Sequence, residues 1–148
     1  MMNNENFKIL LVEDDPGDVD LMKESFKESK TLVDINVVAN GVEAMAYLRK
    51  EGVYSNVNRP SIIFLDLNLP KKDGREVLQD IRSDKNLKEI PIVILSTSDA
   101  ESDIMESYGL GANCFVTKPA GFGQFKKVVN EIKDFWFTTV KLPQSPTG

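Results

Sequence analysis

The sequence predicts an α/β protein built on a doubly wound, five-stranded parallel sheet. Short apolar runs typical of buried strands alternate five times with segments whose apolar residues recur at helical spacing. Such alternation places helices on both faces of one parallel sheet, joined by right-handed crossovers. The chain has 148 residues and is 41% hydrophobic, which suits a single domain with its own core. We expect the strand order 2-1-3-4-5, five helices, one domain over residues 1–138 and a tail over residues 139–148.

The first strand and helix are predicted from an apolar run followed by a capping pattern. The run covers about Lys8–Val12, Asp15 is placed to cap the next helix, and Pro16 takes its first position, where proline is favoured. The inward side of this helix carries apolar residues at helical spacing, namely Val19, Met22 and Phe26. The second strand is expected at Val33–Val38.

The second helix opens with Asn40 and Glu43, which match a capping box. Its expected inward residues are Val42, Met45 and Leu48. A polar loop over Gly52–Pro60 then leads to the third strand at Ser61–Asp66.

The second half of the chain repeats this alternation. A loop over Leu67–Lys72 precedes the third helix, whose inward residues are Val77, Leu78 and Ile81. The remaining elements are expected at Pro91–Ser96 (strand), Glu101–Tyr108 (helix), Asn113–Thr117 (strand) and from Phe122 to Trp136 or slightly beyond (helix).

The last helix carries more apolar residues than one buried side requires. Its expected core stripe is Phe122, Phe125, Val129, Ile132 and Trp136. Further apolar residues on another side and beyond the helix are Val128, Phe135, Phe137, Val140 and Leu142. Two interpretations stay open: ordinary packing over the core, or a homodimer surface formed by the last helix and the tail.

Acidic residues end two of the predicted strands. Glu13 and Asp14 follow the first strand, and Asp66 ends the third. These strands are neighbours in the expected order, and ligands of open α/β sheets bind at the carboxyl ends of the strands. Unit charges ~4 Å apart repel by roughly 4 kcal/mol at an effective dielectric near 20, so the cluster needs a cation. We expect Mg²⁺, with Asp14 and Asp66 as direct ligands and Glu13 acting through water.

Two more strand ends supply groups that suit a phosphoryl oxygen. Ser96 ends the fourth strand with a hydroxyl, and Lys118 follows the fifth with an ammonium group. A hydroxyl can donate a hydrogen bond to a phosphoryl oxygen, and an ammonium can neutralise its charge. Together with the acidic residues, they predict a phosphorylation pocket.

Four motifs contain these residues in order. They are ILLVEDD (Ile9–Asp15), FLDLNLPKKDG (Phe64–Gly74), IVILSTS (Ile92–Ser98) and FVTKPA (Phe115–Ala120). In sequence and spacing they resemble the receiver domains of two-component response regulators, and the resemblance covers essentially the whole chain. It implies a flavodoxin-like fold and a phosphoacceptor that takes a phosphoryl group from a sensor histidine kinase with Mg²⁺.

The resemblance also implies roles for individual residues. Asp66 would be the phosphoacceptor, and the other roles would fall to Glu13 and Asp14 (acidic pair), Asn68 (backbone carbonyl to Mg²⁺), Ser96 (switch hydroxyl), Lys118 (family lysine) and Phe115 (switch aromatic). Many members have tyrosine where Phe115 stands. The protein would be a signalling phosphoacceptor rather than an enzyme, limited to self-phosphorylation from phosphodonors and loss of that phosphoryl group.

Three further segments resemble small single-domain regulators partnered with phytochrome-type histidine kinases. They are Asp15–Asp18 (DPGD), Asp66–Leu78 (DLNLPKKDGREVL) and Asp134–Pro143 (DFWFTTVKLP). The implied partners are such a kinase and a phosphotransfer protein.

Composition excludes several other classes. The net charge of −5 argues against nucleic-acid binding, and no basic signal peptide or apolar membrane span is present. One cysteine, Cys114, and no histidine exclude an internal disulfide and Cys/His metal patterns. We expect a cytoplasmic protein without a DNA-binding output, with Cys114 as a buried apolar residue.

Three other functions share parts of this pattern. A haloacid-dehalogenase-type phosphatase needs a second acid two residues after its nucleophile, where Asn68 cannot transfer a proton. A flavodoxin-like FMN carrier needs a phosphate cradle after the first strand, where Glu13-Asp14-Asp15 would repel the phosphate. An interaction module of the same fold that is never phosphorylated remains open.

Overall fold

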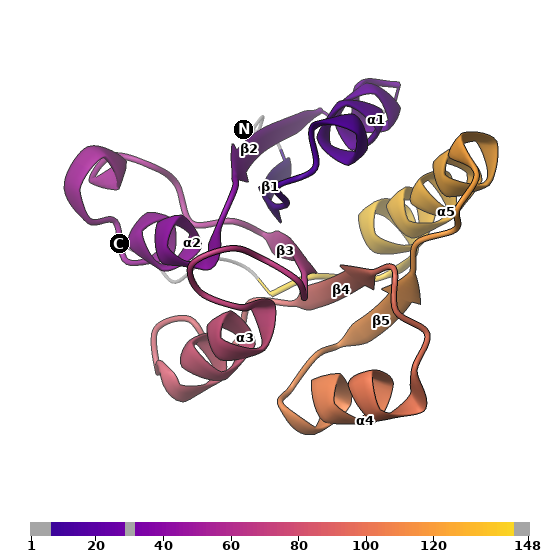
Figure 1. Ribbon diagram of the computed structural model, residues 1–148. Helices are drawn as coiled ribbons and strands as arrows, with labels where there is room; N and C mark the ends of the chain where they lie inside the picture. The colour runs from indigo at the N-terminus through magenta and orange to yellow at the C-terminus, as the bar shows by residue number, and fades with distance from the viewer. Residues whose placement is uncertain (1–6, 29–31, 144–148) are drawn as a thin grey trace.

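The computed structural model describes residues 7–28 and 32–143. Within these residues, five parallel strands form one sheet in the order β2-β1-β3-β4-β5, as predicted (Figure 1). The strands are β1 (Phe7–Val12), β2 (Val33–Val38), β3 (Ile62–Asp66), β4 (Ile92–Ser96) and β5 (Cys114–Thr117). Because all five are parallel, their carboxyl ends meet at one edge of the sheet, which is also the edge predicted to hold the pocket.

Helices cover both faces of the sheet (Figure 1). They are α1 (Pro16–Lys27), α2 (Gly41–Leu48), α3 (Gly74–Ser83), α4 (Glu101–Gly109) and α5 (Phe122–Asp134), with a 3₁₀ turn at Gly52–Tyr54 and a π-helical turn at Phe135–Thr139. α1 and α5 lie on one face, and α2, α3 and α4 lie on the other. The expected fold class and five helices are therefore confirmed.

Two separate apolar clusters fill the space between the sheet and its helices. Alternate residues of β1 supply each cluster: Ile9 and Leu11 pack with α1 and α5, whereas Leu10 and Val12 pack with α2 and α3. The central strands β3 and β4 are buried along their whole length. This explains why their sequences are continuous apolar runs rather than alternating ones.

Asp15 and Asn40 cap their helices as predicted, whereas the Glu43 side chain of the predicted capping box bonds to Tyr54. Asp15 accepts a hydrogen bond from the Gly17 N–H (3.0 Å), and Pro16 is the first residue of α1. Asn40 accepts from the Glu43 N–H (2.8 Å). The Glu43 carboxylate accepts a hydrogen bond from the Tyr54 hydroxyl (2.6 Å), which ties α2 to the 3₁₀ turn.

The prediction that Val42 points inward was wrong, because its side chain is 50% exposed. Gly41 sets which side of α2 faces inward, because it packs closely on the loop that precedes α3. A Cβ added to Gly41 would lie 2.1 Å from the Lys72 carbonyl oxygen. Val42, the next residue, lies about 100° further around the helix axis and so points away from the inward side. Met45 and Leu48 are buried as expected.

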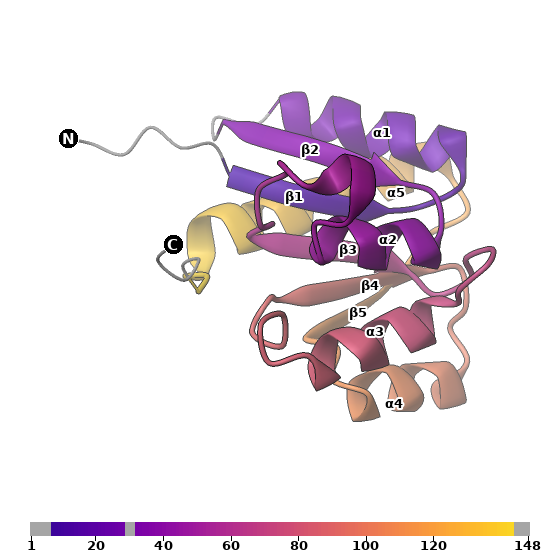
Figure 2. The same ribbon diagram turned by 90° about the vertical axis from the view of Figure 1, so that its left-hand side faces the viewer.

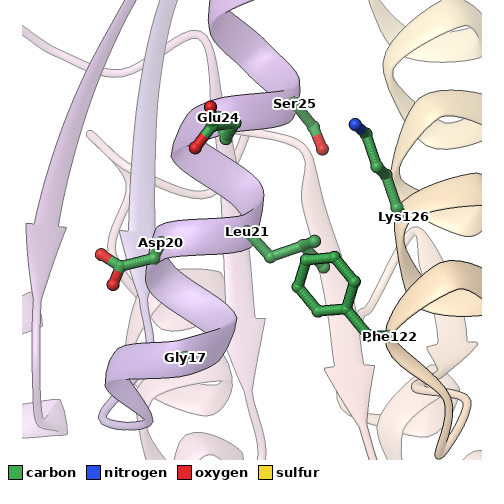
Figure 3. Close-up of a pocket in the computed structure, with 7 residues that line it drawn as sticks. All are labelled: Gly17, Asp20, Leu21, Glu24, Ser25, Phe122 and Lys126. Carbon is green, nitrogen blue, oxygen red and sulfur yellow. The ribbon is translucent and has the colours of Figure 1, made fainter.

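The prediction for Phe122 was also wrong. This residue opens α5 and is 71% exposed, whereas Phe125, Val129 and Ile132 form the buried stripe. Phe122 lies beside α1, at a cleft between the two helices, rather than over the sheet (Figure 3). Cys114 is only half-buried, since it lies on the edge strand β5.

The segment after α5 packs against the protein's own core. The Phe137 ring lies 4.5 Å from the Phe7 ring and 5.5 Å from the Phe26 ring, measured between centroids. Leu142 packs against the same cluster, while Phe135 is half-exposed. Residues 144–148 of the predicted tail lie outside the described residues, and the boundary at residues 138 and 139 stays a prediction. Among the helices described, none has the length and apolar content that crossing a membrane requires.

Candidate functional site

The carboxyl ends of four strands carry the predicted pocket residues to one edge of the sheet. The Glu13 N–H donates to the Val38 carbonyl (3.0 Å), and the Lys118 N–H donates to the Ser96 carbonyl (2.7 Å). These bonds extend the sheet ladder by one residue at each place. The backbones of Glu13 and Lys118 are therefore held by the sheet rather than by a free loop.

Three carboxylates gather at this edge. Glu13, Asp14 and Asp66 each offer an oxygen, and these three oxygens lie within 4.8 Å of one another. Glu13 and Asp66 are only 2% and 9% exposed, whereas Asp14 is exposed. A set of carboxylate oxygens with one side open to water suits a hard divalent cation such as Mg²⁺, which usually keeps several waters. The residues present therefore fit the predicted metal.

The Asp66 carboxylate has a different partner on each oxygen. Its Oδ1 accepts the Asn68 N–H (3.1 Å), and its Oδ2 accepts from Lys118 Nζ (3.3 Å). Asn68 itself is exposed, and this bond holds its backbone beside the carboxylate.

Lys118 forms the cationic centre of the pocket. Its side chain is 5% exposed, and its Nζ lies 2.5 Å from Glu13 Oε1 and 3.0 Å from Asp18 Oδ2, in addition to the contact with Asp66. Sequence reasoning placed Asp18 only in the DPGD segment and gave it no role in the pocket. The available signal was its position: Asp15 fixes the start of α1, and Asp18 lies in the first turn, next to the end of β1.

Burial and neighbouring charges shift the pKa values of Glu13 and Lys118. Burial raises the pKa of Glu13 to about 7; the hydrogen bond from Lys118 opposes this effect and the charge of Asp66 adds to it. Burial disfavours the Lys118 ammonium, but the hydrogen bond to Glu13 and the charge of Asp66 outweigh it and raise its pKa. Lys118 is therefore a fixed positive charge at neutral pH.

Ser96 and Phe115 lie on the two strands beyond β3. Ser96 is fully buried, and its Oγ accepts the Ser98 N–H (3.1 Å). Phe115 is partly buried against the cluster on the α2 and α3 face, and its N–H donates to the Tyr108 hydroxyl of α4 (3.2 Å). A link thus runs from α4 to the backbone of the predicted switch aromatic.

The loop after β3 returns closely onto the strand it leaves. The Gly74 N–H donates to the Leu67 carbonyl (2.8 Å). A Cβ on Gly74 would lie 2.3 Å from the Asp66 carbonyl oxygen, closer than any real contact. Gly74 therefore allows α3 to start directly beside the phosphoacceptor candidate.

Arg75 connects the pocket side of α3 with α4. Its guanidinium contacts Asp103 (2.8 Å) and Glu106 (2.7 Å). Asp103 also accepts from the Ser98 hydroxyl (2.6 Å), and Ser98 contacts the Ser96 hydroxyl. The chain of contacts leads from Ser96 to α3, and sequence reasoning missed it because Arg75 lies 28 positions before Asp103.

A cleft of about 380 Å³ lies between α1 and α5 (Figure 3). Leu21 and Phe122 meet across it, and Ser25 and Lys126 extend toward each other from the two helices. The cleft begins at Gly17, one turn from the acidic residues, so it borders the pocket without including its carboxylates.

Comparison with known proteins identifies the family. The model of the response regulator receiver domain matches residues 9–130. The chain is 47% identical to Response regulator Rcp1 of Synechocystis sp. over 135 residues, which cover 91% of this chain and 92% of Rcp1.

Solved structures agree with this match. The crystal structure of the phosphorylated cyanobacterial phytochrome response regulator RcpA aligns with a TM-score of 0.92 at 51% identity, covering 95% of this chain and all of that one. The Mn²⁺-bound form of Rcp1 aligns with a TM-score of 0.90 at 46% identity, covering 93% and 99% of the two chains. The chain therefore belongs to the response regulator receiver domain family, the phosphoacceptors of two-component signalling.

Proposed function

We propose that Asp66 is the phosphoacceptor and that a histidine kinase supplies its phosphoryl group in the presence of Mg²⁺. The observation that carries this proposal is the place of Asp66, whose carboxylate lies between the acidic residues Glu13 and Asp14 and the ammonium of Lys118. Glu13 shares burial, the contact with Lys118 and membership of that cluster, but its side chain is 1% exposed, whereas that of Asp66 is 11% exposed and therefore more open to a phosphodonor.

The reaction is a transfer between two side chains. An Asp66 oxygen attacks phosphorus, the bond from phosphorus to the kinase's histidine nitrogen breaks, and the nitrogen keeps the electron pair. Asp14, Asp66 and the Asn68 carbonyl would hold Mg²⁺, with Glu13 acting through water; the ion supplies positive charge near the phosphoryl oxygens. Lys118 adds a second positive charge, so that catalysis is mainly positioning and neutralisation.

Switching would follow from the new charge. The phosphoryl group brings acceptor oxygens within reach of the Ser96 hydroxyl. If Ser96 moves toward them, Phe115 fills the space it leaves, which shifts a two-state equilibrium at α4, β5 and α5. Ser98 and Tyr108 support this route, because they join Ser96 and Phe115 to α4. Hydrolysis of the acyl phosphate resets the protein.

The relatives indicate the kind of partner. RcpA is described as a phytochrome response regulator, so we propose a phytochrome-type histidine kinase as the phosphodonor, with a phosphotransfer protein as a further recipient. The output would be a change in protein contacts of a cytoplasmic signalling protein rather than enzymatic turnover of another substrate.

A homodimer through the last helix and the tail is a second proposal for the output. The half-exposed Phe135 ring supports it, whereas Phe137 is occupied by packing within the chain. Sedimentation of the full chain and of a chain truncated at Thr139, over a range of concentrations, tests this surface. A full-length protein that stays monomeric at every concentration excludes it.

The phosphoacceptor is tested by Asp66→Asn. With acetyl phosphate and Mg²⁺, the wild-type protein should acquire an acid-labile phosphoryl group seen by intact-mass spectrometry, and Asp66→Asn should acquire none. Asp99→Asn, which removes the same charge from an exposed loop, is the matched control and should label normally. Full labelling of Asp66→Asn would refute the assignment.

A further inference from the structure

Each of the three N–H donors of Lys118 has a carboxylate to face. Its Nζ contacts Glu13 at 2.5 Å, Asp18 at 3.0 Å and Asp66 at 3.3 Å. A lysine ammonium has three donors and no more. A phosphoryl oxygen can therefore bind Lys118 only if one of these contacts is given up.

The three acceptors differ in how easily they can leave. The Glu13 side chain is 1% exposed, so water could not replace Lys118 as its hydrogen-bond partner. The Asp66 contact, the longest of the three at 3.3 Å, can pass to one phosphoryl oxygen that Asp66 itself carries in the proposed function, so a further contact with the phosphoryl group requires the donor that Glu13 or Asp18 holds. The Asp18 side chain is 21% exposed, so water can replace Lys118 as its partner. Asp18 also lies in the first turn of α1, where the helix dipole stabilises a negative charge.

Asp18 also adds a negative charge that the pocket does not need. Lys118 and a divalent cation together carry three positive charges, which balance Glu13, Asp14 and Asp66 before phosphorylation. The acyl phosphate carries roughly −1.5 to −2 charge in place of the single negative charge of the Asp66 carboxylate, and Asp18 raises the resulting excess by one more. Its carboxylate is therefore both a competitor for Lys118 and a source of repulsion.

We propose that Asp18 is a positioning residue that holds Lys118 in the unphosphorylated state and competes with the phosphoryl group for it. The competition limits how far the phosphorylated form accumulates at a given supply of donor. This inference rests on the proposed role of Asp66, and it assigns to α1 a direct influence on the phosphorylation equilibrium.

Binding of beryllofluoride, a mimic of the acyl phosphate, reports this competition without a phosphoryl-transfer step. We expect Asp18→Asn to bind beryllofluoride about tenfold more tightly than the wild-type protein in saturating Mg²⁺, because a like charge within about 6 Å is removed. Asp20→Asn is the matched control, because it removes one charge from the exposed side of the same helix. It should change the affinity for beryllofluoride by less than about twofold, because exposed charges are screened. Asp18→Glu restores the carboxylate and should return the affinity toward the wild-type value.

The titrations are read by ¹⁹F nuclear magnetic resonance, with the fraction labelled by acetyl phosphate as a second readout that should rise in Asp18→Asn. An affinity of Asp18→Asn equal to that of Asp20→Asn, or weaker than that of the wild type, overturns the competition. If Asp18→Asn does not fold, Asp18→Ser carries the same test. A wild-type protein that binds no beryllofluoride overturns the proposed function itself, and the inference with it.

Discussion

Substituting Asp14 by asparagine should stabilise the metal-free protein. One carboxylate oxygen of Asp14 lies within 4.8 Å of a carboxylate oxygen of Glu13 and of one of Asp66. Two unit charges at that separation repel by about 3 kcal/mol at an effective dielectric of 20 and by about 1 kcal/mol in water. Because Asp14 is exposed, the lower value applies. We expect the free energy of unfolding at pH 8 to rise by about 1 kcal/mol, or roughly 3 °C in Tm.

Magnesium should reverse this order. A ligand at ten times its Kd stabilises the folded state by about 1.4 kcal/mol, and Asp14→Asn loses one of the two proposed direct carboxylate ligands. The wild-type Tm should therefore rise on adding Mg²⁺ while that of Asp14→Asn rises much less. Circular dichroism melts at pH 8, with and without Mg²⁺, measure both effects, and Asp20→Asn is the control for removal of an exposed charge. A metal-free Asp14→Asn protein that is less stable than the wild type would show that repulsion among these carboxylates does not destabilise the fold. An Asp14→Asn protein that gains as much from Mg²⁺ as the wild type would show that Asp14 is not a metal ligand.

Three further results are expected. Lys118→Ala should lower the free energy of unfolding by about 3 kcal/mol in urea titrations, since buried carboxylates lose their cation; it should still label but fail to change its partner contacts, and an unchanged response would remove the switching role. The raised pKa of Glu13 adds stability that is present below pH 4.5 and lost as pH rises through about 7; Mg²⁺ must displace that proton, so the Tm gain from Mg²⁺ should be larger at pH 8 than at pH 6, and an equal gain contradicts it. Gly74→Ala should cost about 1–3 kcal/mol and weaken Mg²⁺ binding in calorimetry, whereas Gly123→Ala, where an added Cβ meets nothing, should be neutral.

The sheet and most of the pocket were predictable because both depend on local patterns. Buried parallel strands are continuous apolar runs, and the residue that ends each run must lie at the same edge of the sheet. The strand pattern alone therefore places Glu13, Asp66, Ser96 and Lys118 at one edge of the sheet. The structure adds the contacts that Lys118 makes.

The contributions of helices to the pocket were not predictable in this way. Asp18 reaches Lys118 from a helix, and that contact depends on where α1 crosses the sheet edge rather than on spacing in the sequence. Val42 and Phe122 were misplaced for a related reason: the rotation of α2 is set by the close approach of Gly41 to a distant loop, and Phe122 lies beside α1 instead of over a strand. The Arg75 contacts join residues 28 and 31 positions apart, which no periodic pattern reveals.

Both ends of the described chain lie at the side of the molecule where β1 begins, opposite the carboxyl ends of the strands (Figure 2). Phe137 packs on Phe7, where β1 begins, and the six residues of β1 separate this place from the pocket by ~20 Å. A fluorescent protein or an affinity handle joined at either terminus should leave phosphoryl chemistry untouched. Tagged versions can therefore be used in living cells to follow when the protein meets its kinase.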